Sequence, residues 1–172
     1  MSETRDVLNA RLPHVDNEAH RGLSDDALAL VTSIAGEVGN NSFDHNLGLW
    51  RDVPGCWFET QVTGGRLWIC VADRGQGIFR SLANVLPDLR DDQAALDVAF
   101  NQRVTGRAPE PRGNGLKFVK SIVTGAPGRG LACASGNGMF EIGDLGPTAA
   151  KLLRTNARPV KGTITLLLWE LT

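Results

Sequence analysis

The sequence predicts a single α/β domain on the strength of three observations. Between residues 25 and 45, apolar residues recur at steps of three and four, which predicts one amphipathic helix. Two strand-like runs, 57–62 and 66–72, flank a Thr-Gly-Gly turn and predict a β-hairpin. A last run, 162–171, is rich in Thr, Ile and Leu and has the length of a strand, well short of a membrane span.

Composition places the chain among ordinary globular proteins. It has 172 residues, of which 42% are hydrophobic and 22% charged, and this size suits one hydrophobic core. The formal net charge of -1 gives no electrostatic footprint for nucleic acid or an anionic membrane. The three cysteines form neither a metal-binding pair nor a disulfide framework. Since the first residues lack the apolar core of a signal peptide, we expect a cytoplasmic protein. From the net charge, we expect it to bind no nucleic acid directly and no membrane.

The N-terminal part divides into a lead-in and the start of the domain. Residues 1–22 are polar and show no clear period, so we expect an irregular or weakly helical segment before a domain that spans 23–172. Ser24 is a typical N-cap for the first long helix, and the two aspartates after it suit the positive end of the helix dipole. Gly39 lies inside this helix, where glycine costs about 1 kcal/mol relative to alanine. A close approach by another backbone or by a ligand would explain this glycine, although nothing in the sequence requires one.

The middle and end of the chain alternate short helices, turns and strands. Helical stretches are expected around 79–86 and 92–101. Residues 102–114 contain two glycines, two prolines and three arginines, which predicts a loop that can meet an anion. The other expected elements are a helix at 115–123, strands at 131–134 and 139–142, and an irregular stretch at 143–161 with a helix near 148–154.

Three polar residues recur at four-residue steps near the end of the first long helix, namely Glu37, Asn41 and His45. Positions four apart lie on one face of a helix, so a carboxylate, an amide and an imidazole point the same way. Such a face is costly to bury against an apolar core and suits the wall of a pocket. A solvated polar face explains these three residues equally well, so residues further along the chain have to decide.

Two glycine clusters follow. Asp73, Gly75 and Gly77 come at the end of a predicted strand, and residues 113–115, Gly-Asn-Gly, come directly before a predicted helix. A glycine-rich turn at a helix N-terminus offers free backbone N–H groups and a positive dipole end, which together bind phosphate. Neither cluster is a Walker loop or a complete dinucleotide fingerprint. Taken alone, each cluster is also explained by a plain turn.

In combination and in this order, the motifs resemble the GHKL ATPase family, which includes gyrase B, MutL, the histidine kinases and the anti-sigma serine kinases. The resemblance covers roughly residues 24–171 and implies the Bergerat fold, a two-layer α/β sandwich with helices on one face of a mixed, mostly antiparallel sheet. It also implies ATP and Mg²⁺ as ligands. The matching motifs are Glu37-x-x-x-Asn41-x-x-x-His45, Asp73-x-Gly75-x-Gly77, Arg112-Gly113-x-Gly115-Leu116 and Gly162-Thr163.

The resemblance implies a role for each residue around the base and the metal. Asn41 matches the amide that coordinates magnesium, and its neutral oxygen suits a hard cation that phosphates already bridge. Asp73 matches the carboxylate that accepts a hydrogen bond from the adenine amino group. Gly75 and Gly77 match the glycines that let the backbone pass close to the base, and Thr163 matches the hydroxyl near the adenine.

The second glycine cluster matches the loop that faces the phosphates. Residues 79–112 would be the ATP lid, and Arg112 at its end is a candidate for neutralising phosphate charge. Lys117 departs from the family pattern, because many members have a further glycine there, and residues 143–161 match no family role. The residues whose backbone N–H groups would face the phosphates are Gly113, Asn114, Gly115 and Leu116.

Glu37 decides the subclass that the resemblance implies. The first residue of this box is typically asparagine or histidine in sensor histidine kinases, and glutamate in the anti-sigma serine kinases and the hydrolysing members. A carboxylate there can take a proton from an attacking hydroxyl or water, which makes Glu37 the candidate catalytic base. No phosphoacceptor histidine with a following helix pair is visible. The chain is therefore most similar to the stand-alone anti-sigma serine kinases.

Three hypotheses about function follow from the resemblance. The first is a protein kinase that phosphorylates serine or threonine of a STAS-type partner and also binds a sigma factor. The second is an ATP-hydrolysing switch, and the third is a binding module without catalysis. Sequence does not separate the first two, because a hydroxyl and a water need the same base. Relatives of this kind are often homodimers, although no exposed apolar stripe in this sequence identifies an interface.

Overall fold

The computed structural model describes residues 1–171 except 21, 47–48, 103–113 and 156–158. Its strands are β1 (Cys56–Thr63), β2 (Arg66–Asp73), β3 (Arg129–Gly136), β4 (Gly138–Ile142) and β5 (Val160–Glu170). Its helices are α1 (Arg5–Arg11), α2 (His14–Ala19), α3 (Asp25–Asp44), α4 (Ile78–Ala83), α5 (Asp92–Asn101), α6 (Gly115–Thr124) and α7 (Gly146–Arg154).

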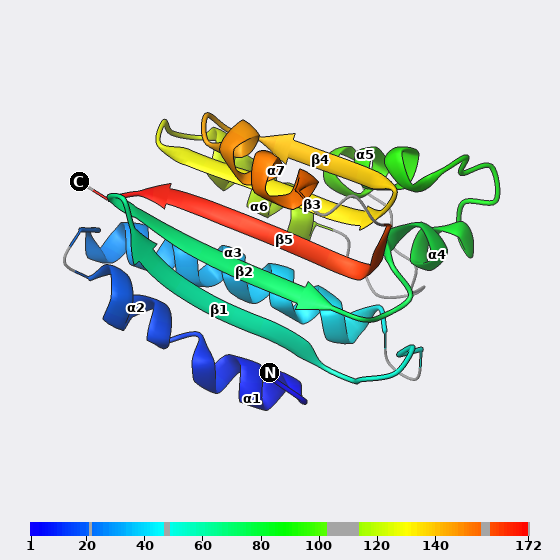
Figure 1. Cartoon of the computed structure of the whole chain (residues 1–172), viewed down its shortest axis with the longest axis horizontal. Coiled ribbons are helices and arrows are strands. Elements are labelled where there is room, and N and C mark those ends of the chain that lie inside the picture. Colours follow the sequence, from blue (N-terminus) through cyan, green and yellow to red (C-terminus); the bar gives the residue numbers. More distant parts are fainter. Residues whose placement is uncertain (21, 47–48, 103–113, 156–158, 172) are drawn as a thin grey trace.

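The described strands form one five-stranded sheet in the order β1-β2-β5-β3-β4, and every neighbouring pair is antiparallel (Figure 1). The predicted α/β fold class is therefore confirmed. The register sets Asp73 at the end of β2 directly opposite Thr163 in β5. Asp73, which begins the first glycine motif, and Thr163, which follows Gly162, are far apart in sequence but lie side by side on neighbouring strands.

The main layer of helices packs on one face of the sheet. Along β2, burial alternates residue by residue, and Leu67, Ile69 and Val71 point into the core that this layer covers. The predicted N-cap of α3 is confirmed, since the Ser24 hydroxyl accepts a hydrogen bond from the Ala27 N–H at 3.3 Å. Figure 1 shows α3 and α6 side by side behind the sheet, which makes the expected two-layer sandwich.

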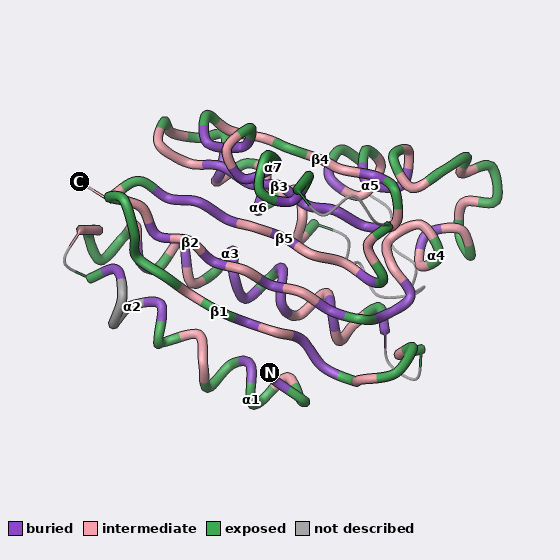
Figure 2. The backbone as a smooth tube through the Cα atoms, in the orientation of Figure 1, coloured by how far each residue is buried: buried purple, intermediate pink, exposed green. Residues whose placement is uncertain are grey.

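The opposite face of the sheet also carries a helix, which the expectation of helices on one face did not include. There α7 packs on β3, β4 and β5. Both faces of β3 are consequently buried: Leu131 and Cys133 belong to the main core, while Ala132 and Ala134 pack under α7 (Figure 2). Alanines on that face of the strand allow the short helix to approach closely.

The N-terminal residues form two helices that belong to the main core. The side chains of Leu8, Val15 and Ala19 are fully buried there. Because these apolar residues are spread over two short helices on either side of Pro13, no single window of sequence shows a helical period. The lead-in that was expected to be irregular or weakly helical thus contains two short helices, and both pack into the main core. None of the described helices combines the length and apolarity needed to cross a membrane.

Gly39 is explained by this N-terminal packing. A Cβ at position 39 would lie 2.6 Å from Leu8 Cδ2, so only glycine lets α1 lie this close to α3. The start of α1 is also tied to the sheet, because Ser2 and Cys56 exchange two backbone hydrogen bonds of 2.7 and 2.9 Å. These contacts bring residues 2–11 against the C-terminal half of α3.

We expect Leu8→Ala to lower the free energy of unfolding by about 2–5 kcal/mol, because it removes a fully buried side chain and leaves a cavity against α3. The matched control is Val7→Ala on the same helix, where the side chain is 43% exposed, and its effect should stay within about 0.5 kcal/mol. Chemical denaturation measures both. Equal effects of the two substitutions would show that α1 is not part of the core.

Candidate functional site

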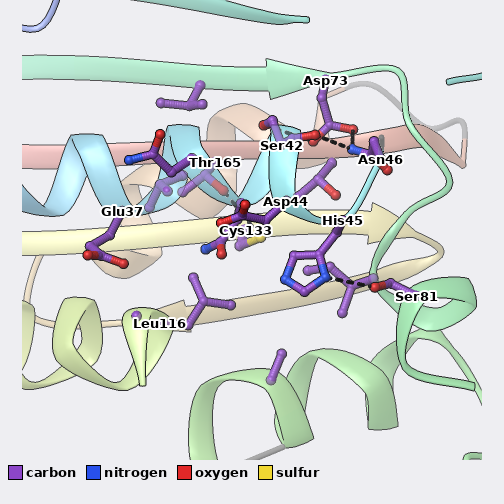
Figure 3. A pocket seen from close by; sticks show the side chains of 18 of the residues that line it. Glu37, Ser42, Asp44, His45, Asn46, Asp73, Ser81, Leu116, Cys133 and Thr165 are labelled. Carbon is purple, nitrogen blue, oxygen red and sulfur yellow. Dashed lines mark hydrogen bonds between the residues drawn. The ribbon is translucent and has the colours of Figure 1, made fainter. Parts of the chain in front are cut away.

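A cavity of about 540 Å³ lies on the helix side of the sheet, bounded by α3, α4 and α6 and by the adjoining ends of β2 and β5. Its volume is in the range of small-molecule sites. In Figure 3, Glu37 and Leu116 lie on one side of the view, and Asp73 and Asn46 lie on the other. The predicted site residues that line the cavity are Glu37, Asn41, Asp73, Gly77, Asn114, Gly115, Leu116 and Thr163.

The polar face of α3 lines this cavity with all three of its residues, Glu37, Asn41 and His45. The face is therefore the wall of a pocket and not only a solvated helix surface. His45 is the C-cap residue of α3, and its Nδ1 lies 3.1 Å from the Ser81 hydroxyl of α4 (Figure 3). This contact joins the end of α3 to the helix that follows the first glycine cluster.

Asp73 is a buried carboxylate at the end of β2, with 7% of its surface exposed. Its Oδ1 accepts hydrogen bonds from the Gly75 N–H at 2.8 Å and the Asn46 amide at 3.3 Å, and its Oδ2 accepts one from the Ser42 hydroxyl at 3.2 Å (Figure 3). Burial raises the pKa of Asp73, and these hydrogen bonds oppose that rise. These hydrogen bonds offset the free-energy cost of burying a carboxylate.

Asn46 connects the residues of this network, and it lies outside the motifs of the sequence. The residue is 4% exposed, and its Nδ2 also donates to the Ser42 carbonyl while its Oδ1 accepts from the Gln76 N–H, both at 2.9 Å. A Cβ at Gly75 would lie 2.0 Å from this amide. Gly75 is thus required by the packing of Asn46, and it lies behind the cavity wall. The sequence signal for Asn46 was its four-residue spacing from Ser42, which places both residues on one helix face. This pair is not part of the Glu37–Asn41–His45 motif.

Gly77 and Ser135 shape the turn that leads into α4. Gly77 has φ 82°, a left-handed conformation that glycine adopts at little cost, and it is the N-cap of α4. The Ser135 hydroxyl accepts from the Ile78 N–H at 3.0 Å and donates to the Gly162 carbonyl at 2.9 Å. This buried serine connects the first glycine cluster to the Gly162-Thr163 pair of β5.

The opposite end of the cavity is formed where Glu37 meets the start of α6. A Cβ at Gly115 would lie 2.5 Å from Glu37 Oε2, so the glycine lets the start of α6 lie directly against this carboxylate. Asn114, the N-cap residue, makes no side-chain cap to the first turn of α6. Two further predicted residues of this loop, Arg112 and Gly113, lie outside the described residues.

The floor of the cavity contains a buried thiol. Cys133 in β3 is 2% exposed and accepts a hydrogen bond from the Thr165 hydroxyl at 3.3 Å. Burial raises the pKa of the Cys133 thiol to about 12, so the residue is a neutral apolar wall at physiological pH. Cys133 lies in the strand predicted at 131–134, but nothing in the sequence indicates that its side chain lines a cavity.

Two amide atoms in the cavity wall are left without partners. Within the described part of the chain, Asn40 Oδ1 and Asn41 Nδ2 are buried and have no hydrogen-bond partner. Buried polar atoms are normally satisfied, so these amides point to a bound water, ion or ligand group. Elsewhere among the described residues, no three His, Cys, Asp or Glu side chains converge to hold a metal on their own. A cation here would need further oxygen ligands beside Asn41.

Comparison with models of known protein families finds no match to this chain, and comparison with curated proteins finds none either.

We expect the free energy of unfolding to depend on pH because Asp73 is buried. Its folded pKa lies above the ordinary 3.8, so ionised Asp73 costs stability at neutral pH, and this cost disappears as the pH falls through the interval between the folded pKa and 3.8. Asp73→Asn removes the titration. The free energy of unfolding of wild type relative to Asp73→Asn should therefore rise as the pH is lowered from 7 to 4, measured by chemical denaturation. A difference that stays constant or falls would contradict the raised pKa.

Proposed function

We propose that this protein is a GHKL-type ATP-binding protein that transfers the γ-phosphate of Mg-ATP to a serine or threonine of a partner protein. The observation that supports the proposal is the convergence of separate motifs on one cavity. A buried carboxylate stands at one end, the glycine-started helix α6 and the Glu37 carboxylate stand together at the other, and the Asn41 amide of α3 lies between them. This is the order that a base, a metal and a phosphate chain require.

Asp73 suits the recognition of an adenine amino group. A carboxylate offers about four acceptor sites, and those of Asp73 receive hydrogen bonds from Ser42, Asn46, Gly75 and the Thr163 backbone. An adenine amino group would therefore take the place of a long hydrogen bond such as that of the Ser42 hydroxyl at 3.2 Å. Thr163, directly opposite Asp73 on β5, adds a hydroxyl on the same side. The neutral thiol of Cys133 offers an apolar surface to the flat base.

Asn41 and the first turn of α6 suit a magnesium–phosphate group. Asn40 Oδ1 and Asn41 Nδ2 have no hydrogen-bond partner, so this wall has unused hydrogen-bonding capacity, and the Asn41 N–H donor suits a phosphate oxygen. The Asn41 amide would hold Mg²⁺, with Asn114, Gly115 and Leu116 presenting backbone N–H groups to the phosphates. When bound, the metal would neutralise part of the negative charge of the phosphates.

Glu37 is the proposed general base. Its carboxylate lines the cavity beside the start of α6, where the end of the phosphate chain is expected. The acceptor hydroxyl oxygen forms a bond to the γ-phosphorus while the bond from that phosphorus to the bridging oxygen breaks and ADP leaves. The proton of the hydroxyl passes to Glu37. By resemblance, the acceptor is a STAS-type regulator, and a sigma factor is a second binding partner.

The experiment that tests binding is calorimetric titration of ATP and ADP, with and without Mg²⁺. Both nucleotides should bind, and Asp73→Ala should weaken binding by about 1.5–3 kcal/mol, the value of a hydrogen bond to a charged group. Asn41→Ala should remove the dependence on magnesium. The matched control, Asp97→Ala, changes an exposed carboxylate of α5 and should leave affinity unchanged. Absence of nucleotide binding to the wild-type protein would refute the proposed function.

Glu37→Gln should leave nucleotide affinity largely intact and slow phosphate transfer by about 10²–10⁴-fold, because the amide cannot accept the proton. Phosphorylation of a candidate partner and release of phosphate without a partner are both measured. Glu59→Gln, on an exposed part of β1, is the control and should keep full activity. Full activity of Glu37→Gln would remove Glu37 from the role of base. Phosphate release that needs no partner would identify water as the acceptor.

A further inference from the structure

The N-terminal helix brings a guanidinium to the cavity. Arg5, the first residue of α1, lines the cavity and pairs with the carboxylate of Asp44 at the end of α3. The side chains of Arg5 and Asp44 are 40% and 24% exposed, so the pair sits at the rim. Neither residue belongs to the motifs described above, and the N-terminal segment had no expected role in the site.

Charge gives this arginine a function. Among the described residues that line the cavity, Glu37, Asp44 and Asp73 carry carboxylates, and Arg5 carries the permanent positive charge. Three carboxylates repel a polyphosphate unless cations compensate for them. A guanidinium presents a planar fork of N–H donors that matches phosphate oxygens. Arg5 is therefore the side chain of the cavity that is suited to neutralise phosphate charge.

The structure also holds Arg5 in place from both sides. Before it, Ser2 is paired with Cys56 through two backbone hydrogen bonds, and the Thr4 hydroxyl caps α1 by accepting from the Val7 N–H at 3.3 Å. After it, Leu8 is fully buried against Gly39. The backbone that carries Arg5 is therefore fixed before any ligand binds, which lowers the entropy cost of using its side chain.

We propose that Arg5 binds the phosphate groups of the nucleotide, and that Asp44 holds its guanidinium at the rim until phosphate replaces that carboxylate. The inference rests on the proposed function, because it assigns a phosphate-binding residue to the same cavity. It makes the N-terminal helix a part of the binding site and not only of the core.

The test is calorimetric titration of ATP and adenosine into Arg5→Ala. Affinity for ATP should fall roughly 10- to 150-fold, as expected for loss of a hydrogen-bonded charge, while affinity for adenosine stays unchanged. Added salt should weaken ATP binding less steeply in Arg5→Ala than in wild type. The matched control is Arg11→Ala at the other end of α1, whose side chain pairs with Glu59 and does not line the cavity. It should bind ATP like wild type.

The double variant Arg5→Ala with Asp44→Asn separates two roles of the arginine. If Arg5 contacts phosphate, ATP affinity stays low in the double variant. If Arg5 only neutralises Asp44, affinity returns to the wild-type value, and the inference is overturned. Equal ATP affinity of wild type and Arg5→Ala overturns this inference alone, whereas a wild type that binds neither ATP nor adenosine overturns the proposed function together with it.

Discussion

The cavity depends on one buried charge, the carboxylate of Asp73. A carboxylate with 7% of its surface exposed is tolerated only when donors surround it, and here the donors come from the end of α3, the turn after β2 and the Thr163 backbone of β5. Ser42 and Asn46 lie at the end of α3, and the Gly75 N–H lies in the turn after β2. Satisfying Asp73 therefore requires the end of α3 to lie over the end of β2. The polar face of α3 is then directed at the cavity and not at the apolar core.

Missing Cβ atoms set the distances between the helices around this network. Glycine at position 39 lets α1 lie against α3, and glycine at 115 lets the start of α6 meet the carboxylate of Glu37. At position 75, glycine leaves room for the Asn46 amide beside Asp73. Each of these glycines lies where side chains from another element would otherwise collide. The three contacts place α1, α6 and the turn after β2 around one helix, which explains why α3 is the centre of the site.

Most helices and strands, and the polar face of α3, could be predicted from the sequence because each depends on a local pattern of residues. The four-residue step from Glu37 to His45 predicts one helix face without any knowledge of the fold. Asn46 and Arg5 are different, because their partners lie in β2 and α3, and local spacing does not show which distant residue each of them contacts. The N-terminal segment was expected to be irregular or weakly helical, because each of its two helices is too short to show a period. The sheet face that α7 covers was not predicted, because a short helix does not reveal which face it packs on. The roles of Arg112 and Gly113 stay predictions, as both lie outside the described residues.

The same arrangement explains how one cavity accommodates several carboxylates with different tasks. Asp73 is buried and surrounded by donors, Glu37 stands beside the start of a helix whose dipole favours negative charge, and Asp44 is paired with Arg5. Each negative charge thus has its own local compensation. Under the proposed function, an entering phosphate chain competes for two of these compensations, the guanidinium of Arg5 and the start of α6. It leaves the donors of Asp73 untouched, so recognition of the base and binding of the phosphates are energetically separate tasks.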